Sequence, residues 1–196
     1  VVAFVGALAA SSVALALARG RNGTAVTTLL LTGLALNALC SAGVGLLSYV
    51  ADDTALRNFI FWSLGSCARA TPAQLLLAAP LLLLVWAGAL GYARHLDALL
   101  LGEREAGYLG VRVERLKLGV LLLVALGVGV SVALTGLIGF IGLIAPHLAR
   151  RLVGALHRQM LPVSAVIGAL LLVLADLICR TAWAPAEVPV GILTAL

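Results

Sequence analysis

Two oppositely charged residues lie close together in a stretch of the sequence that is otherwise apolar. Asp176 and Arg180 fall near the end of the run Leu161–Thr181 and are four residues apart. On a helix this spacing places both side chains on the same face, and an unpaired charge in a bilayer costs on the order of a few kcal/mol. Three roles stay open: an ion pair that fixes the end of a helix, a proton or ion relay, or an Arg180 that acts at the outer surface.

The sequence lacks the motifs that most enzymes use. Its single lysine, Lys117, is followed by Leu118, so there is no glycine loop ending in Gly-Lys-Ser/Thr to hold the phosphates of ATP. HExxH and GxSxG are absent, and His147 is isolated from any cysteine or carboxylate at metal-ligand spacing. We therefore expect no intrinsic catalysis and no metal or cofactor bound by this chain. The cysteines are interpreted as small buried hydrophobic residues: Cys40, Cys67 and Cys179.

Small residues are dense between positions 127 and 142, and Pro146 follows them. Small side chains three or four residues apart allow helices to approach closely in lipid, and a proline removes one helical hydrogen bond and kinks the helix. The run predicts either tight packing alone or helices that pivot around a shared pathway. Its members are Gly127, Gly129, Ser131, Gly136, Gly139 and Gly142.

The longest polar segment combines charges with apolar residues. Leu99–Leu101 precedes Gly102–Gly110, which has the pattern of a short amphipathic helix with glycine at both ends. The segment is either a solvated loop or a docking surface for a partner. The apolar stripe from Leu99 to Leu109 favours docking.

The composition indicates a membrane protein. Of 196 residues, 63% are hydrophobic and 11% are charged, with a mean hydropathy of +1.16, whereas soluble domains are about 45–50% apolar and about 25% charged. The net charge is +5, but the thirteen basic residues form no single basic face, so a nucleic-acid partner is not expected. The solvent of this chain is the lipid bilayer.

Several apolar runs are long enough to cross a bilayer, which takes about 20 residues. They do not alternate apolar and polar residues as barrel strands do, so the sequence predicts an all-α polytopic transmembrane bundle, a single domain over residues 1–196. It has about six spans and the start of a seventh, and we interpret it as an internal piece of a longer membrane protein. The predicted spans are Val1–Ala18, Leu29–Val50, Thr71–Tyr92, Leu116–Leu137, the short Ile138–Val153, Leu161–Thr181 and the beginning Pro189–Leu196.

The basic residues predict the orientation. If the spans alternate in direction, one side holds ten of the thirteen and the other holds Arg57, Arg69 and Arg180. The positive-inside rule places the ten in the cytoplasm, and with them the loop 95–117. The ten are Arg19, Arg21, Arg94, Arg104, Arg112, Arg115, Lys117, Arg150, Arg151 and Arg158.

Four blocks of sequence resemble one permease family. Thr135–Arg150, TGLIGFIGLIAPHLAR, is similar to the signature of the FecCD-like permeases, which serve type II ABC importers of iron–siderophores, haem and vitamin B12. The other blocks follow in the family's order: Leu29–Gly33 (LLLTG), Leu101–Gly110, and Ala175–Arg180 with Glu187–Ile192. The resemblance covers nearly the whole chain. It implies a fragment, roughly the C-terminal two thirds, of a ten-span permease that lacks the opening spans and the end of the last span.

The resemblance also implies partners and residue roles. Such a permease pairs with a second permease copy in the bacterial cytoplasmic membrane, above two ATPase subunits that bind ATP and Mg, and it receives cargo from a periplasmic or lipid-anchored binding protein. The loop would contact the ATPase through Gly102, Glu103, Glu105, Ala106, Leu109 and Gly110. The entry to the Leu29–Val50 span would form a cytoplasmic gate through Thr24, Thr27 and Thr28.

At the other end, Arg180 would meet acidic residues of the binding protein. Further motif positions are expected to be structural: Gly136, Gly139, Gly142, Pro146, His147 and Asp176. An ATP-driven importer permease for an iron chelate or cobalamin is thus the main interpretation. The alternative is a secondary transporter driven by an ion gradient, with Asp176 and His147 as the relay; a third, an intramembrane hydrolase, lacks a paired nucleophile and base.

Overall fold

The computed structural model describes residues 2–20, 23–24, 26–182 and 189–195. Helices make up nearly all of this part of the chain, and two strands of two residues each form a small antiparallel pair with Arg19 opposite Thr24. The elements in order are α1 (Val2–Ala18), β1 (Arg19–Gly20), β2 (Gly23–Thr24), α2 (Val26–Val50), α3 (Asp53–Ser63), the 3₁₀ turn η1 (Cys67–Arg69), α4 (Pro72–Leu99), α5 (Glu103–Tyr108), α6 (Val113–Thr135), α7 (Ile141–Val153), α8 (His157–Ala182) and α9 (Val190–Ala195).

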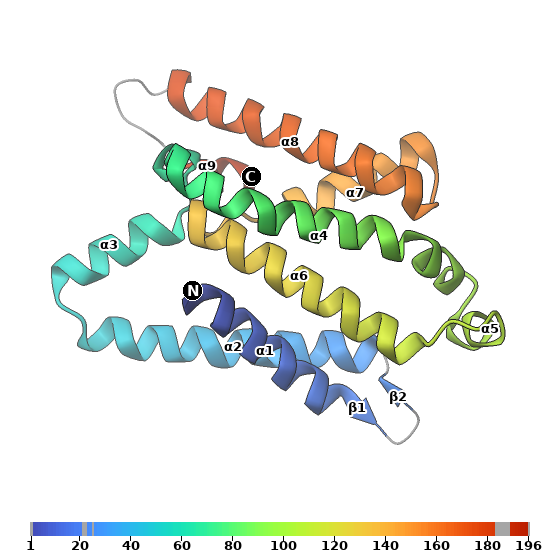
Figure 1. Ribbon diagram of the computed structural model, residues 1–196. Coiled ribbons are helices and arrows are strands. Elements are labelled where there is room, and N and C mark those ends of the chain that lie inside the picture. Colours follow the sequence, from blue (N-terminus) through green and yellow to red (C-terminus); the bar gives the residue numbers. More distant parts are fainter. Residues whose placement is uncertain (1, 21–22, 25, 183–188, 196) are drawn as a thin grey trace.

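The long helices form a bundle with two distinct ends (Figure 1). The β1–β2 pair, α5 and the turn from α7 to α8 lie at one end, which we call the basic end, and α3 and α9 lie at the other, which we call the α3 end. Arg150 and Arg151 occupy the last turn of α7 at the basic end. The alternation of span directions therefore follows the predicted topology.

The predicted fold class is confirmed. In the described part of the chain, four helices are long and apolar enough to cross a membrane, within α2, α4, α6 and α8, and α1 is a shorter apolar helix. The predicted short span before Val153 is α7, and α9 begins where a seventh span was expected. Of the block Glu187–Ile192, Glu187 and Val188 lie outside the described residues.

Some predicted boundaries were wrong. α4 continues seven residues beyond Tyr92, because residues 93–99 contain no helix breaker although they are more polar than the span before them. α6 ends at Thr135, because Gly136 adopts a conformation (φ 75°, ψ −161°) that cannot continue a helix. α7 runs through Pro146 without interruption.

The helices pack through small side chains, and their large apolar side chains face outward. Alanines at helix contacts are buried, among them Ala93, Ala125 and Ala149, whereas leucines such as Leu47 and Leu76 are more than 70% exposed. Close approach through small residues and an apolar exterior is the pattern of helices in lipid. Cys179 is buried as predicted and Cys67 is partly buried, but the prediction is wrong for Cys40, which lies exposed on α2.

Candidate functional site

At the basic end, α5 projects a mostly exposed surface. Gly102 (φ 114°) and Gly110 (φ 84°) bound the helix in conformations that favour glycine, so the predicted glycine boundaries are confirmed. Tyr108 is 91% exposed and Leu109 64%. Ala106 is fully buried, and its carbonyl accepts a hydrogen bond from the backbone N–H of Val111.

These exposures divide the predicted contact residues of the loop into two groups. Glu103, Glu105 and Leu109 are exposed and open to a partner, whereas Ala106 faces the bundle and anchors the helix. The apolar stripe begins earlier than α5, because Leu99 is the last residue of α4. The exposed apolar part of the loop consists of Leu100, Leu101, Tyr108 and Leu109.

Lys117 joins α5 to α6. Its Nζ lies 2.7 Å from Oε2 of Glu103, the first residue of α5, and 3.6 Å from Oε1 of Glu114, and its side chain is only 12% exposed. The sequence around this lysine excludes a nucleotide-binding loop, but its contact with α5 was not predicted. The available signal was its position one turn after Glu114, at the start of a span.

Asp97 joins the end of α4 to the start of α8. Its Oδ1 accepts a hydrogen bond from the backbone N–H of His157 at 2.6 Å and lies 2.8 Å from His157 Nδ1. Because the first N–H groups of a helix have no partner within it, a carboxylate at this position stabilises the start of α8. This contact was missed, since the two residues are 60 positions apart.

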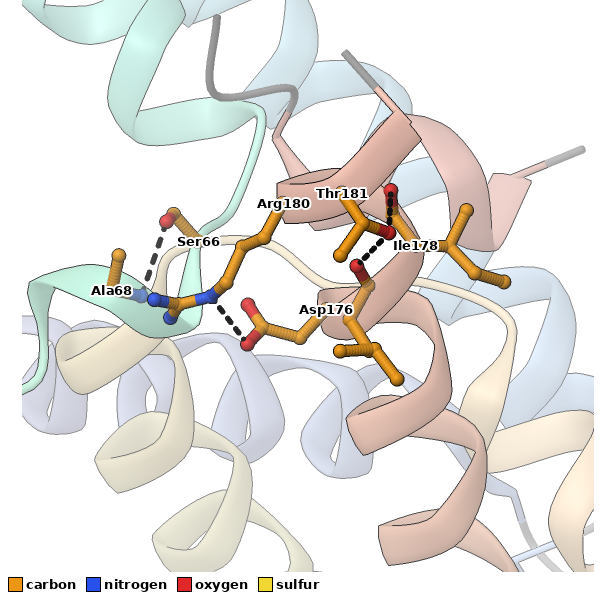
Figure 2. Close-up of polar contacts among 7 residues, drawn as sticks. Ser66, Ala68, Asp176, Ile178, Arg180 and Thr181 are labelled. Carbon is orange, nitrogen blue, oxygen red and sulfur yellow. Dashed lines mark hydrogen bonds and ion pairs between the residues drawn. The ribbon is translucent and has the colours of Figure 1, made fainter. Parts of the chain in front are cut away.

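At the α3 end, Asp176 and Arg180 form the predicted ion pair. Arg180 Nε donates to Asp176 Oδ2 at 2.8 Å, and the side chains are 51% and 24% exposed respectively. Figure 2 shows the guanidinium reaching over Asp176 towards the turn that contains Ser66 and Ala68. About half of the Arg180 side chain is thus exposed at this end.

The same turn carries Cys67, a partly buried thiol outside the membrane spans. Burial raises the pKa of the Cys67 thiol, the carboxylate of Asp176 raises that pKa further, and the guanidinium of Arg180 lowers it. The sum of these effects is a raised pKa, so this thiol is protonated at neutral pH.

Three segments pack backbone against backbone at the α3 end. The N–H of Ser66 donates to the carbonyl of Thr135 at 2.7 Å, and the N–H of Gly191 donates to the carbonyl of Leu64 at 3.1 Å. A Cβ on Gly136 or Gly191 would overlap the carbonyl oxygen of Trp62 or Leu64. We call this contact between the end of α3, the end of α6 and the start of α9 the glycine junction; its glycines are Gly65, Gly136 and Gly191.

The predicted run of small residues is not uniform. Gly127 contacts Val85 of α4, since a Cβ there would lie 3.2 Å from a Val85 methyl, and Gly136 belongs to the glycine junction. A Cβ on Gly139 or Gly142 would meet nothing within 4 Å. Within this chain Gly127 and Gly136 are therefore closely packed, whereas Gly139 and Gly142 have open space beside them.

A groove of about 540 Å³ lies against α4 and α6. Several of the small residues line it, including Gly127, Ser131 and Gly136, and none of its lining residues is charged. The groove is also lined by Gly142 of α7 and Leu161 of α8, so it presents an uncharged surface shared by four helices.

The predicted gate residues lie at the entry to α2. Thr27 and Thr28 are exposed in its first turns, and the carbonyl of Thr28 accepts a hydrogen bond from Thr32 Oγ1 at 2.8 Å. Thr24 pairs with Arg19 in the strand pair, and its side chain lies outside the described residues.

The two residues of the alternative relay are not brought together. Ala145 of α7 lies beside Gly168 of α8, and Asp176 is eight residues, about 12 Å, further along α8. His147 lies two residues beyond Ala145 towards the basic end and is exposed. Asp176 is already paired with Arg180.

The fold and these sites define a polytopic helical membrane protein. Over residues 1–196 the sequence matches the model of the FecCD transport family. The chain belongs to the FecCD transport family, which consists of transport permeases and not of enzymes.

Relatives and a solved structure agree with this assignment. The chain is 50% identical to the hemin transport system permease HmuU of Yersinia pestis, over 99% of this chain and 58% of that protein. It is 45% identical to the vitamin B12 import permease BtuC of Vibrio cholerae, over 85% of this chain and 50% of that one. A structure described as an inward-facing conformation of a metal-chelate type ABC transporter superposes with a TM-score of 0.85 at 36% identity, covering 98% of this chain and 68% of the other. The chain thus spans about half the length of the curated relatives it matches.

Proposed function

We propose that this chain is the membrane-spanning permease part of an ATP-driven importer in the bacterial cytoplasmic membrane. The cargo is a metal chelate: an iron–siderophore, haem or cobalamin. The observation that carries the proposal is the match to the hemin permease of Yersinia pestis, 50% identical along 99% of this chain. The structural likeness to a metal-chelate ABC transporter supports the same function.

The energy comes from separate ATPase subunits that bind ATP and Mg. The exposed face of α5 supports this, because exposed apolar side chains on a polar loop mark a surface that a partner covers. In this proposal Glu103, Glu105 and Leu109 contact the ATPase, Ala106 packs against the bundle, and Gly102 and Gly110 form the turns at the two ends of the helix.

A binding protein delivers the chelate at the α3 end. The half-exposed side chain of Arg180 places a positive charge at this end, and charge pairs at the rim of an interface speed association and set orientation. The pairing with Asp176 holds the guanidinium in position rather than forming a relay.

A second permease copy completes the pathway, and Thr24, Thr27 and Thr28 at the entry to α2 contribute its cytoplasmic gate. Binding of ATP moves α5, the bundle halves rock, and the pathway opens alternately to each side. The free energy of ATP hydrolysis sets the direction of transport, and the permease has two conformations of similar free energy.

The test is reconstitution of the permease that contains this segment with its ATPase and binding protein in proteoliposomes. We expect copurification with the ATPase and uptake that needs ATP, with haem, a ferric siderophore and cobalamin supplied in turn on the binding protein. Uptake driven by an ion gradient without the ATPase would refute the proposal.

A variant pair tests the role of α5. Leu109→Glu introduces a charge on the exposed face of α5 and should abolish the stimulation of ATP hydrolysis by loaded binding protein. Leu152→Glu makes the same change at a 72% exposed leucine in the last turn of α7 and serves as the control. Parental stimulation of ATP hydrolysis in Leu109→Glu would contradict the role of α5.

A further inference from the structure

Lys117 occupies an unusual position for a lysine. It is the single lysine of the chain, it lies in the second turn of α6, and its side chain is 12% exposed. Lysine is rarely buried unless its ammonium group has partners. Here the partners are Glu103 at 2.7 Å and Glu114 at 3.6 Å.

The bridge between Lys117 and Glu103 connects two elements that the backbone joins only loosely. α5 is bounded by Gly102 and Gly110, both with positive φ, and glycine rotates more freely than other residues. Of the six residues of α5 only Ala106 is buried, so few side-chain contacts fix the orientation of the helix. A charge-assisted hydrogen bond from α6 to the first residue of α5 fixes it.

α6 continues from this bridge to the other end of the bundle. It has 23 residues, about 34 Å of helix, and it ends at Gly136 in the glycine junction with α3 and α9. Along the way it forms one side of the groove with α4. A movement of α5 that is carried into α6 therefore reaches both this groove and the α3 end.

We propose that Lys117 is a positioning residue that holds α5 against α6, so that displacement of α5 by the ATPase is transmitted into the membrane domain. This inference rests on the proposed function of α5. Lys117 acts from within the protein, through Glu103, and its low exposure keeps it away from the surface that the ATPase covers.

The variants are chosen to separate this role from folding and from ATPase binding. Lys117→Met keeps the length of the side chain and removes the charge, and Lys117→Arg keeps the charge. Glu103→Gln removes the bridge from the other side. Arg151→Gln removes one positive charge from an exposed position on α7 at the same end and is the matched control.

The first measurement is hydrogen exchange of the amides of α5 in the purified permease. We expect at least five-fold faster exchange in Lys117→Met and Glu103→Gln and no change in Lys117→Arg or Arg151→Gln. Unchanged exchange in Lys117→Met overturns the inference without any reference to ATPase.

The second measurement is the number of chelate molecules taken up per ATP hydrolysed in the full complex. We expect Lys117→Met to copurify with the ATPase as the parent does but to lose at least five-fold in this ratio, with Lys117→Arg close to the parent. The double variant Glu103→Gln/Lys117→Met belongs to the exchange measurement, where no ATPase is present: since both changes break the same bridge, α5 should exchange no faster in it than in the faster single variant. A parental uptake ratio in Lys117→Met, or additive increases in α5 exchange, overturns the inference and leaves the proposed function intact. A parent that does not recruit the ATPase overturns both.

Discussion

The glycine junction makes a sharp prediction for Gly136. Its backbone (φ 75°, ψ −161°) lies in a region that is essentially restricted to glycine, where another residue costs about 1–3 kcal/mol. The added methyl of Gly136→Ala would also overlap the carbonyl oxygen of Trp62, and overpacking of this kind costs about 1–3 kcal/mol. We therefore expect a loss of about 3 kcal/mol or more in the free energy of unfolding, since backbone on both sides leaves little room to adjust.

Gly139→Ala is the control, three residues away in the same motif. Nothing lies within 4 Å of its added methyl, and its φ is not positive. A glycine replaced at an unstrained position stabilises by about 0.4–1 kcal/mol through the unfolded state, so no loss is expected. The assay is thermal unfolding of both variants in detergent, where a loss of 3 kcal/mol corresponds to about 6–12 °C for a chain of this size. Equal melting temperatures for the two variants would refute the argument that the motif glycines differ in role.

Three further predictions address other contacts. Asp97→Ala removes both hydrogen bonds to His157 and should destabilise the protein by about 2 kcal/mol, whereas Asp97→Asn keeps an acceptor and should cost less than half as much; equal losses in thermal unfolding would contradict the capping role. In a variant that retains only Cys67, labelling by a maleimide that does not cross membranes should occur from outside the cell and should keep rising with pH beyond the range of an ordinary thiol, because the pKa of Cys67 is raised. Asp176→Asn removes a negative charge and should lower that pKa, so labelling at pH 7.5 should become faster; an unchanged rate would show that burial alone sets the reactivity. The same Asp176→Asn variant should retain ATP-dependent uptake of the chelate, and complete loss of uptake with an intact complex would favour the relay interpretation.

The spans could be predicted because lipid imposes a length and a composition on each of them. The exact ends of the helices could not. Hydropathy indicates which residues lie in the bilayer, whereas a helix continues until a residue such as glycine or proline ends it. α4 therefore extends beyond its apolar part to Leu99. The start of α7 was predicted too early because Phe140 adopts a positive φ of 62°. This conformation is uncommon for an aromatic residue, so the sequence does not indicate it.

The site contacts divide by distance along the chain. Asp176 and Arg180 could be paired from sequence, because residues four apart meet on any helix. The contacts of Glu103 with Lys117 and of Asp97 with His157 depend on how separate helices pack, which spacing does not encode. Likewise, a glycine that is required for its backbone conformation, such as Gly136, looks the same in sequence as Gly139, which has open space around it.

The arrangement of these contacts explains how a bundle with many small side chains can transmit a movement. Small residues allow helices to approach closely, but they do not by themselves fix how one helix lies against another. Polar contacts join neighbouring helices at the basic end, where Lys117 holds α5 to α6 and Asp97 holds α4 to α8. At the α3 end the backbone contacts around Gly136 fix α6 to α3 and α9. α6 is thus fixed to its neighbours at both ends and packs against α4 through Gly127 in between. In the proposed mechanism, a displacement of α5 is therefore transmitted along α6 to the opposite face of the membrane.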